Sequence, residues 1–418
     1  MDFAPSPRAE TLRAQVARFF EAELLPRHRE WQGHVVERRQ PAPFMAALRE
    51  AARAAGLWNL ALPGLADTEP GTRCSNLEFA PLAEIMGRLP WGSEPFNCHA
   101  PDVPNMVLLQ EAASPEQKRR WLVPLLEGKT RSAFAMTEPG VASSDATNIA
   151  TTIRRAGAKY VINGRKWYIT GAAHPECTIL LVLGQQVNDA PGERGRTQRH
   201  SVVIVPMAAA GVRLVRPLRF IGWEDHVAPV GELELTDVEV PVENLIGEEG
   251  HGFAATQARL GPARIHHCMR LLGAAEVMVE LMIARARERQ TFGRTVIEYD
   301  SVQQAIALSR IEIEQARLLV LKSAWTIDSA GFKGGWRELS LAKIAVPAAV
   351  QRIADRALQI FGAMGGSDDT PIHHALAYAR LMRIGDGPDE VHLRQIFRTE
   401  PQPAWSIAAS PYISAPAP

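Results

Sequence analysis

The stretch KYVINGRKWYITG, Lys159 to Gly171, marks the point at which the character of the chain changes. It is rich in β-branched and aromatic residues, and the Asn163-Gly164 dipeptide in its middle is typical of a tight hairpin. Further β-rich runs follow, among them TILLVLG, HSVVIVP and VGELELTDVEVP, with turn residues between them. Because no helical pattern separates these runs, we expect a mostly antiparallel barrel or sandwich over residues 132–248.

The segments on both sides of this β region have helical patterns. Residues 1–131 contain AETLRAQVARFFEAELLP, APFMAALREAARAAGL and SPEQKRRWLVPLLEG, with apolar residues three and four positions apart. Residues 249–405 begin with the long pattern MRLLGAAEVMVELMIARARERQ. In the next helix one face is formed by Ile306, Ser309, Ile313, Ala316, Val320 and Ile327. We therefore predict an α+β fold with an N-terminal helical domain, a middle antiparallel β domain, a C-terminal helical bundle and a flexible tail at 406–418.

Composition limits the classes of function. The 418 residues include 46 basic and 46 acidic side chains, so net charge offers no attraction for nucleic acid or a membrane surface. The four cysteines are scattered without a CxxC pair, which suits a reducing compartment and disfavours a disulfide framework or a zinc site. No apolar run approaches about 18 residues, and the N-terminus lacks an apolar signal core. We expect a soluble, cytoplasmic protein without membrane insertion.

Two short motifs have plain structural interpretations. GHGFAA, residues 250–255, matches a relaxed dinucleotide-binding pattern, but no parallel βαβ unit surrounds it and position 270 is Arg rather than an acid. We interpret it as a strand-to-helix turn. His266, His267 and Cys268 are adjacent on a helix and point in different directions, so we expect a structural role rather than a metal site. No GxSxG or Walker motif is present.

A candidate functional acid lies in ARLMRIGDGPDEVHLRQIF, residues 379–397. Asp386 stands between two glycines, of which Gly385 suits the left-handed turn that ends a helix. Pro388 can open the next helix, with acids in its first turn. The local pattern leaves two interpretations open. Asp386 is either one more capping acid or a functional carboxylate, because glycines let a ligand approach the backbone closely.

Six stretches of the chain, in order, resemble the acyl-CoA dehydrogenase family: AMTEPGVASSD, NGRKWYITGA, RQTFG, QQAIA, LQIFGAMGG and GDGPDEVH. LGPARIHHCMR and DGPDEVH are most similar to the branch whose animal members carry a fused kinase-like domain, and we expect only the dehydrogenase part here. The resemblance implies an N-terminal helical domain, a middle β domain and a C-terminal four-helix bundle, with FAD in the groove between them.

The resemblance also implies a reaction, the FAD-dependent α,β-dehydrogenation of an acyl-CoA thioester to the trans-2-enoyl-CoA, as in fatty acid β-oxidation. A carboxylate removes the α-proton, flavin N5 takes the β-hydride, and an electron-transferring flavoprotein later accepts the electrons. The family base is usually Glu, and its position falls here on Asp386, which is one methylene shorter and is followed by Gly387 on the substrate side. Arg264 matches an arginine near the acyl thioester.

Thirteen residues match family positions that contact FAD: Phe134, Met136, Thr137, Ser144, Tyr168, Thr170, Arg289, Phe292, Gln304, Gln359, Gly362, Asp389 and Glu390. Ser144 also matches a residue near the acyl-CoA, but GVASSD is one residue longer than the common GAGSD, so Ser143 could exchange roles with it. Tyr168 stands where most members have Trp against the isoalloxazine ring. Thr170 matches the hydroxyl that bonds flavin N5.

The same resemblance implies a homodimer or homotetramer, because Arg289 and Phe292 match residues that reach the FAD of a neighbouring subunit. Two other functions stay open. One is a flavin oxidase or monooxygenase of the same fold, such as a nitroalkane oxidase, which also uses an aspartate base. The other is an acyl-CoA-binding protein without turnover. The length and branching of the acyl chain depend on pocket volume, which a sequence does not display.

Overall fold

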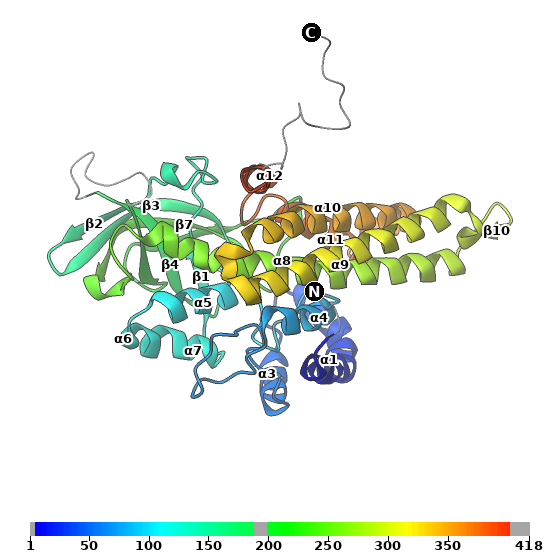
Figure 1. The fold of residues 1–418 in the computed structure, drawn as a ribbon, viewed down its shortest axis with the longest axis horizontal. Coiled ribbons are helices and arrows are strands. Elements are labelled where there is room, and N and C mark those ends of the chain that lie inside the picture. Colours follow the sequence, from blue (N-terminus) through cyan, green and yellow to red (C-terminus); the bar gives the residue numbers. More distant parts are fainter. Residues whose placement is uncertain (1–4, 188–198, 402–418) are drawn as a thin grey trace, which may run out of the picture.

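The computed structural model describes residues 5–187 and 199–401, so the predicted tail at 406–418 lies outside the described residues. Helices, a β-sheet and a second group of long helices follow one another along the chain (Figure 1). The predicted α+β organisation is therefore confirmed. Among the described residues, none of the helices combines the length and the apolar character that a membrane span requires.

The N-terminal part is a group of helices, and all three stretches predicted to be helical are helical. The helices are α1 (Pro7–Phe19), α2 (His28–Val36), α3 (Met45–Ala54), α4 (Asn76–Met86), α5 (Asp102–Ala112), α6 (Pro115–Gln117) and α7 (Val123–Leu126). Short π-helical turns at Phe20–Leu24 and Lys118–Leu122 extend α1 and join α6 to α7. Capping boxes begin two of the helices: Ser75 pairs with Glu78, and Ser114 with Gln117.

The middle part is an eight-stranded sheet. Its strands are β1 (Arg131–Ala135), β2 (Thr152–Ala156), β3 (Lys159–Ile169), β4 (Cys177–Gln186), β5 (His200–Pro206), β6 (Val212–Pro217), β7 (Gly231–Pro241) and β8 (Leu245–Ile246). The order is β6-β7-β3-β2-β4-β5-β8, and β1 pairs with β4. Most pairs are antiparallel, as predicted, but β4 is parallel to both β1 and β2.

The predicted hairpin at Asn163-Gly164 is wrong. Strand β3 continues through this dipeptide, and the turn that precedes it lies at Gly157, whose φ is 65°. The Asn163 side chain instead exchanges hydrogen bonds with Asp237 on β7, at 3.0 and 2.8 Å. A Cβ at Gly164 would lie 2.3 Å from the Thr151 hydroxyl, so the glycine permits a close contact between segments rather than a turn.

The C-terminal part is a bundle of long helices. It contains α8 (Gly252–Glu288), α9 (Asp300–Gly334), α10 (Trp336–Phe361), α11 (Ile372–Met382) and α12 (Asp389–Arg398), and a small hairpin, β9 (Gln290–Thr291) and β10 (Arg294–Thr295), joins α8 to α9. Five of the six residues predicted to form the inner face of α9 are buried, and Ile306 is partly buried against the same core. The GHGFAA segment follows β8 and forms the start of α8, which confirms its interpretation as a strand-to-helix turn.

One apolar core joins the N-terminal helices to the bundle, and a second, smaller core lies within the sheet. Helices α4 and α8 approach each other closely at two glycines. A Cβ at Gly87 would lie 1.9 Å from the Arg270 carbonyl oxygen, and one at Gly273 would lie 1.9 Å from the Glu84 carbonyl oxygen. This packing fixes the first half of α8 between the N-terminal helices and the rest of the bundle, where the candidate site lies.

Candidate active site

Asp386 lies in the sharp corner between α11 and α12. Its own φ is 55° and that of Gly387 is 102°, whereas Gly385 has no positive φ, so the prediction that Gly385 forms the left-handed turn is wrong. Asp is among the few residues that tolerate this conformation, and such strain is concentrated at functional sites. The N-cap of α12 is Pro388, and no side chain caps that helix. The interpretation of Asp386 as a capping acid therefore has no support at α12.

Buried cations hold the backbone of this corner. Arg264 donates from Nε to the Asp386 carbonyl at 2.8 Å. Lys343 donates to the carbonyls of Met382 and Gly385, the latter at 2.9 Å. These bonds satisfy carbonyl groups that a helix end leaves unpaired. Arg383 closes the corner by pairing with the Asp389 carboxylate at 2.8 and 2.7 Å, so Asp389 already has a partner within its own chain.

The Asp386 side chain, 20% exposed, is surrounded by positive charge. Burial lowers the pKa of Arg259 to about 10 and also lowers the pKa values of Arg264 and Lys343, while the Asp386 charge opposes each of these shifts. Among the Arg, Lys and His side chains of the described residues, His267 brings a nitrogen closest to the Asp386 carboxylate, with Nε2 3.5 Å from Oδ2. Asp386 is therefore a partly buried carboxylate among cations and not a solvated surface acid.

The conformation of Gly387 gives a first testable prediction. A Cβ there would lie 3.1 Å from His392 Nε2, and the φ of 102° is strained for any L side chain. We expect Gly387→Ala to lower the free energy of unfolding by about 1–3 kcal/mol, measured by urea denaturation. Gly385→Ala is the matched control, because its Cβ would meet nothing closer than 3.5 Å and its φ is ordinary. Equal losses in the two variants would contradict this account.

A cavity of about 60 Å³ lies between α8, α11 and the loop before β7. Its polar lining consists of Arg88, His99, Trp223, Asp225, Arg270, His374 and Tyr378. The Trp223 and His374 rings meet edge to face at 4.7 Å, and the Tyr378 hydroxyl lies 2.6 Å from His267 Nδ1. Tyr378, which lines the cavity, therefore contacts His267, and His267 in turn lies next to the Asp386 carboxylate. Sequence analysis missed these residues, because they come from distant segments and form no motif.

The sheet supplies a second group of candidate residues. The guanidinium of Arg259 lies over the Phe134 ring at 4.4 Å, which connects β1 to the part of α8 nearest Asp386. The Thr137 carbonyl accepts a hydrogen bond from Trp167 N at 3.0 Å, and its hydroxyl donates to the Trp167 carbonyl. Tyr168 is 40% exposed and has a φ of 50°. Thr170, directly after the end of β3, is partly exposed.

The two neighbouring serines have different environments. The Ser143 hydroxyl accepts a hydrogen bond from Glu138 N at 2.9 Å and donates to the Val141 carbonyl at 3.4 Å, so it stabilises its own loop. The Ser144 side chain is exposed. Of the two, Ser144 is therefore the more exposed residue, whereas the Ser143 hydroxyl is engaged by its own loop.

Five predicted cofactor residues lie at the far end of the bundle: Arg289, Phe292, Gln304, Gln359 and Gly362. Phe292 is 96% exposed at the tip of the β9–β10 hairpin, which projects away from the sheet (Figure 1). Arg285 packs over the Phe361 ring at 5.6 Å, which places the end of α10 beside the end of α8. Within one chain, the structure does not bring these five residues close to the candidate residues of the sheet, such as Phe134 and Tyr168.

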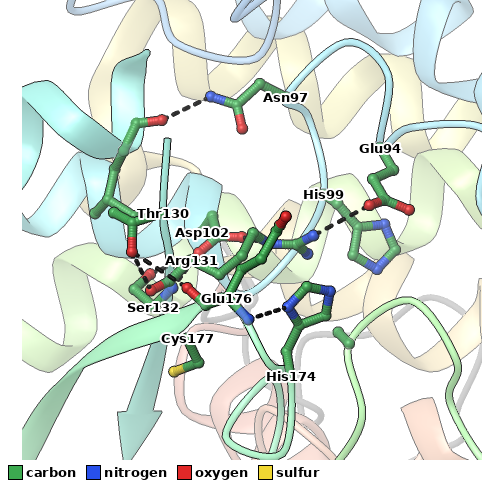
Figure 2. Close-up of polar contacts among 12 residues, drawn as sticks. Glu94, Asn97, His99, Asp102, Thr130, Arg131, Ser132, His174, Glu176 and Cys177 are labelled. Atoms are coloured by element: carbon green, nitrogen blue, oxygen red, sulfur yellow. Dashed lines mark hydrogen bonds and ion pairs between the residues drawn. The ribbon is translucent and has the colours of Figure 1, made fainter. Parts of the chain in front are cut away.

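A buried polar network links the site to the N-terminal helices, and Figure 2 shows its Asp102, Arg131 and Ser132 members. Asn105 on α5 accepts a hydrogen bond from Arg259 Nε at 2.7 Å and donates to the Ser132 hydroxyl at 2.9 Å. Ser132 donates to Asp102, which in turn binds Arg131 Nε at 2.5 Å. Asp102 and Asn105 therefore fix Arg259, the cation that lies over the Phe134 ring.

The fold and the site together define a three-part α+β protein with a partly buried carboxylate among cations in the corner between α11 and α12. Family models for the N-terminal, middle and C-terminal domains of acyl-CoA dehydrogenase match residues 6–129, 133–238 and 250–400. The chain belongs to the acyl-CoA dehydrogenase family.

Individual relatives agree with this assignment. The chain is 47% identical over 406 residues to "Probable acyl-CoA dehydrogenase FadE2" of Mycobacterium tuberculosis, covering 96% of this chain and 97% of that one. It is 45% identical to "Acyl-CoA dehydrogenase family member 10" of Mus musculus, covering 94% of this chain but only 37% of that one. A Mycobacterium abscessus structure described as an acyl-CoA dehydrogenase has a TM-score of 0.89 at 44% identity, covering 94% of this chain and 98% of that one.

Proposed function

We propose that the protein catalyses the α,β-dehydrogenation of an acyl-CoA thioester to the trans-2-enoyl-CoA, with Asp386 as the base. The observation that carries the proposal is the Asp386 corner, in which a partly buried carboxylate in a strained conformation is surrounded by Arg259, Arg264 and Lys343. Membership of the acyl-CoA dehydrogenase family supports the class of reaction.

The residues of the corner have separate tasks in this proposal. Asp386 accepts the α-proton, which requires its carboxylate to face the α-carbon. Arg264 and Arg259 supply positive charge near the atoms on which negative charge develops as that proton leaves. Gly387 would lie on the substrate side of the corner, where a Cβ would come within 3.1 Å of His392 Nε2. Ser144 would bind the acyl-CoA from the sheet side.

We propose that FAD binds in the groove between the sheet and the bundle. The residues present fit a flat aromatic group, since Tyr168 holds a large, partly exposed ring in a conformation that is costly for a residue other than glycine. The residues that would hold it on this side are Phe134, Met136, Thr137, Tyr168, Thr170, Asp389 and Glu390. When bound, FAD would supply the hydride acceptor, and an electron-transferring flavoprotein would be the next electron acceptor.

We further propose a homodimer or homotetramer in which Arg289, Phe292, Gln304, Gln359 and Gly362 of one subunit complete the FAD site of another. The position of Phe292 at an exposed hairpin tip supports this arrangement, because its ring is open to a neighbouring subunit. An arginine such as Arg289 is suited to a diphosphate, which it can bind with two parallel hydrogen bonds.

Anaerobic titration of the purified flavoprotein with a panel of acyl-CoA thioesters tests the proposed function. We expect at least one thioester to remove the absorbance of the oxidised flavin and to yield its trans-2-enoyl-CoA. Rapid reoxidation by air with formation of peroxide would instead identify an oxidase or monooxygenase. Tight binding of acyl-CoA with no loss of flavin absorbance would identify a binding protein without turnover.

A further inference from the structure

The imidazole of His267 occupies a position in the site that the proposed function leaves without a role. Arg264, His267 and Arg270 are three residues apart along α8 and therefore share one face of this helix. The first holds the backbone of the Asp386 corner, and the last lines the neighbouring cavity. His267 lies between them, buried, with its Nε2 atom 3.5 Å from Asp386 Oδ2.

The partners of His267 fix the position of its proton. Its Nδ1 atom lies 2.6 Å from the Tyr378 hydroxyl and 3.1 Å from Arg270 Nη2. A guanidinium can only donate, so Nδ1 must accept, and a neutral imidazole then carries its proton on Nε2. Burial, followed by the charge of Arg270, holds the pKa of His267 well below its usual range, so the ring stays neutral. The Nε2–H group consequently faces the Asp386 carboxylate.

The other charged and titratable groups around His267 and Asp386 do not contact the Asp386 carboxylate as His267 does. Arg259 and Arg264 on α8 and Lys343 on α10 act on Asp386 through their charge, but in the described part of the chain none brings a nitrogen as close to its carboxylate as His267 does. His392 on α12 faces the Asp386 carbonyl, at 3.4 Å, and not the carboxylate. His266, the neighbour of His267, packs edge to face on Phe79 at 5.0 Å and points elsewhere.

We propose that His267 is a positioning residue for the base, with Tyr378 and Arg270 as the groups that set its tautomer. The Nε2–H group holds Oδ2 of Asp386, which leaves Oδ1 to accept the substrate α-proton. The distance of 3.5 Å is long for a hydrogen bond, and such contacts tighten when a ligand binds. A short aspartate needs this support, because a carboxylate that turns away from the α-carbon loses its reactive geometry. The inference rests on the proposed function.

The test compares two leucine substitutions at adjacent buried positions of α8. We expect His267→Leu to slow flavin reduction at saturating acyl-CoA by about 10²-fold, the scale of loss for a misplaced reactive group. His266→Leu serves as the control and should keep the wild-type rate. His267→Gln carries an amide N–H near the position of Nε2 and should recover most of the rate, which a purely structural role would not predict. Equal rates in the two leucine variants would overturn the proposal.

A second measurement does not depend on turnover. In the holoprotein labelled with ¹⁵N-histidine, the signals lost in His267→Leu belong to His267. We expect them to show a neutral ring with its proton on Nε2 at neutral pH, and a proton on Nδ1 would overturn the proposal. If the tautomer is as expected but no acyl-CoA reduces the wild-type flavin, the proposed function fails. If the wild type is reduced and His267→Leu keeps its rate, only the role of His267 fails.

Discussion

We expect the Asp386→Asn protein to fold and to retain FAD but to be reduced by acyl-CoA about 10²- to 10⁴-fold more slowly than the wild type, the range that general base catalysis contributes. The substitution keeps the size and shape of the side chain and removes its capacity to accept a proton. The backbone of the corner should persist, because Arg264 and Lys343 bind its carbonyl oxygens and not the Asp386 carboxylate.

The measurement is the rate of loss of oxidised-flavin absorbance after anaerobic mixing with a saturating acyl-CoA that reduces the wild type. Asp368→Asn makes the same chemical change at a fully exposed carboxylate, paired with His373 at 3.3 Å, and should keep the wild-type rate. Asp386→Glu retains a carboxylate and should be reduced faster than Asp386→Asn. A folded, yellow Asp386→Asn protein that bleaches at the wild-type rate would exclude Asp386 as the base.

The parts of the fold that sequence predicted are those set by local patterns. Helical periodicity identified the buried face of α9, from Ser309 to Ile327, because that face repeats within a single element. Gly385 and Pro388 correctly predicted that the Asp386 corner is a turn between two helices. The residue with the left-handed conformation, however, is Asp386 and not Gly385. Local rules identify where a chain turns more reliably than which residue adopts the unusual conformation.

The errors and omissions concern contacts between distant segments. Asn163-Gly164 has the composition of a hairpin, but β3 is paired on both sides, with β2 and β7, and these ladders override the local preference. Sequence analysis assigns His267 a structural role because adjacent helical residues point in different directions. Its partners, Tyr378 and Asp386, lie more than 100 residues away, where a local pattern does not reveal them. The sequence offered no signal for that convergence beyond the spacing of three residues between Arg264, His267 and Arg270.

The Asp102→Asn substitution should cause a large loss of stability. One oxygen of Asp102 accepts from the backbone N–H and the hydroxyl of Ser132, both at 2.7 Å, and the other accepts from Arg131 Nε at 2.5 Å. Both residues of the ion pair are almost fully buried, and Figure 2 shows them side by side. Burial opposes the charge of Arg131, but the attraction of Asp102 and then of Glu94 raises its pKa, so Arg131 stays charged.

An asparagine can satisfy only one side of this arrangement, because its amide nitrogen would face either Arg131 or Ser132, and both donate. Glu94, at 3.3 Å, would be left as the partner of the buried guanidinium, together with the more distant Glu176. Breaking a buried ion pair in this way costs about 3–5 kcal/mol. We expect a loss of this size in the free energy of unfolding, obtained from the shift of the urea midpoint and the slope of the transition.

Glu280→Gln provides the comparison, because it removes the charge from a carboxylate–arginine ion pair with a similarly short distance on the surface. Glu280 binds Arg88 at 3.0 and 2.6 Å, but its side chain is 56% exposed. Water replaces the lost partner there, so this variant should lose no more than about 1 kcal/mol. If the two variants lose the same free energy, burial does not determine the strength of the Asp102–Arg131 pair.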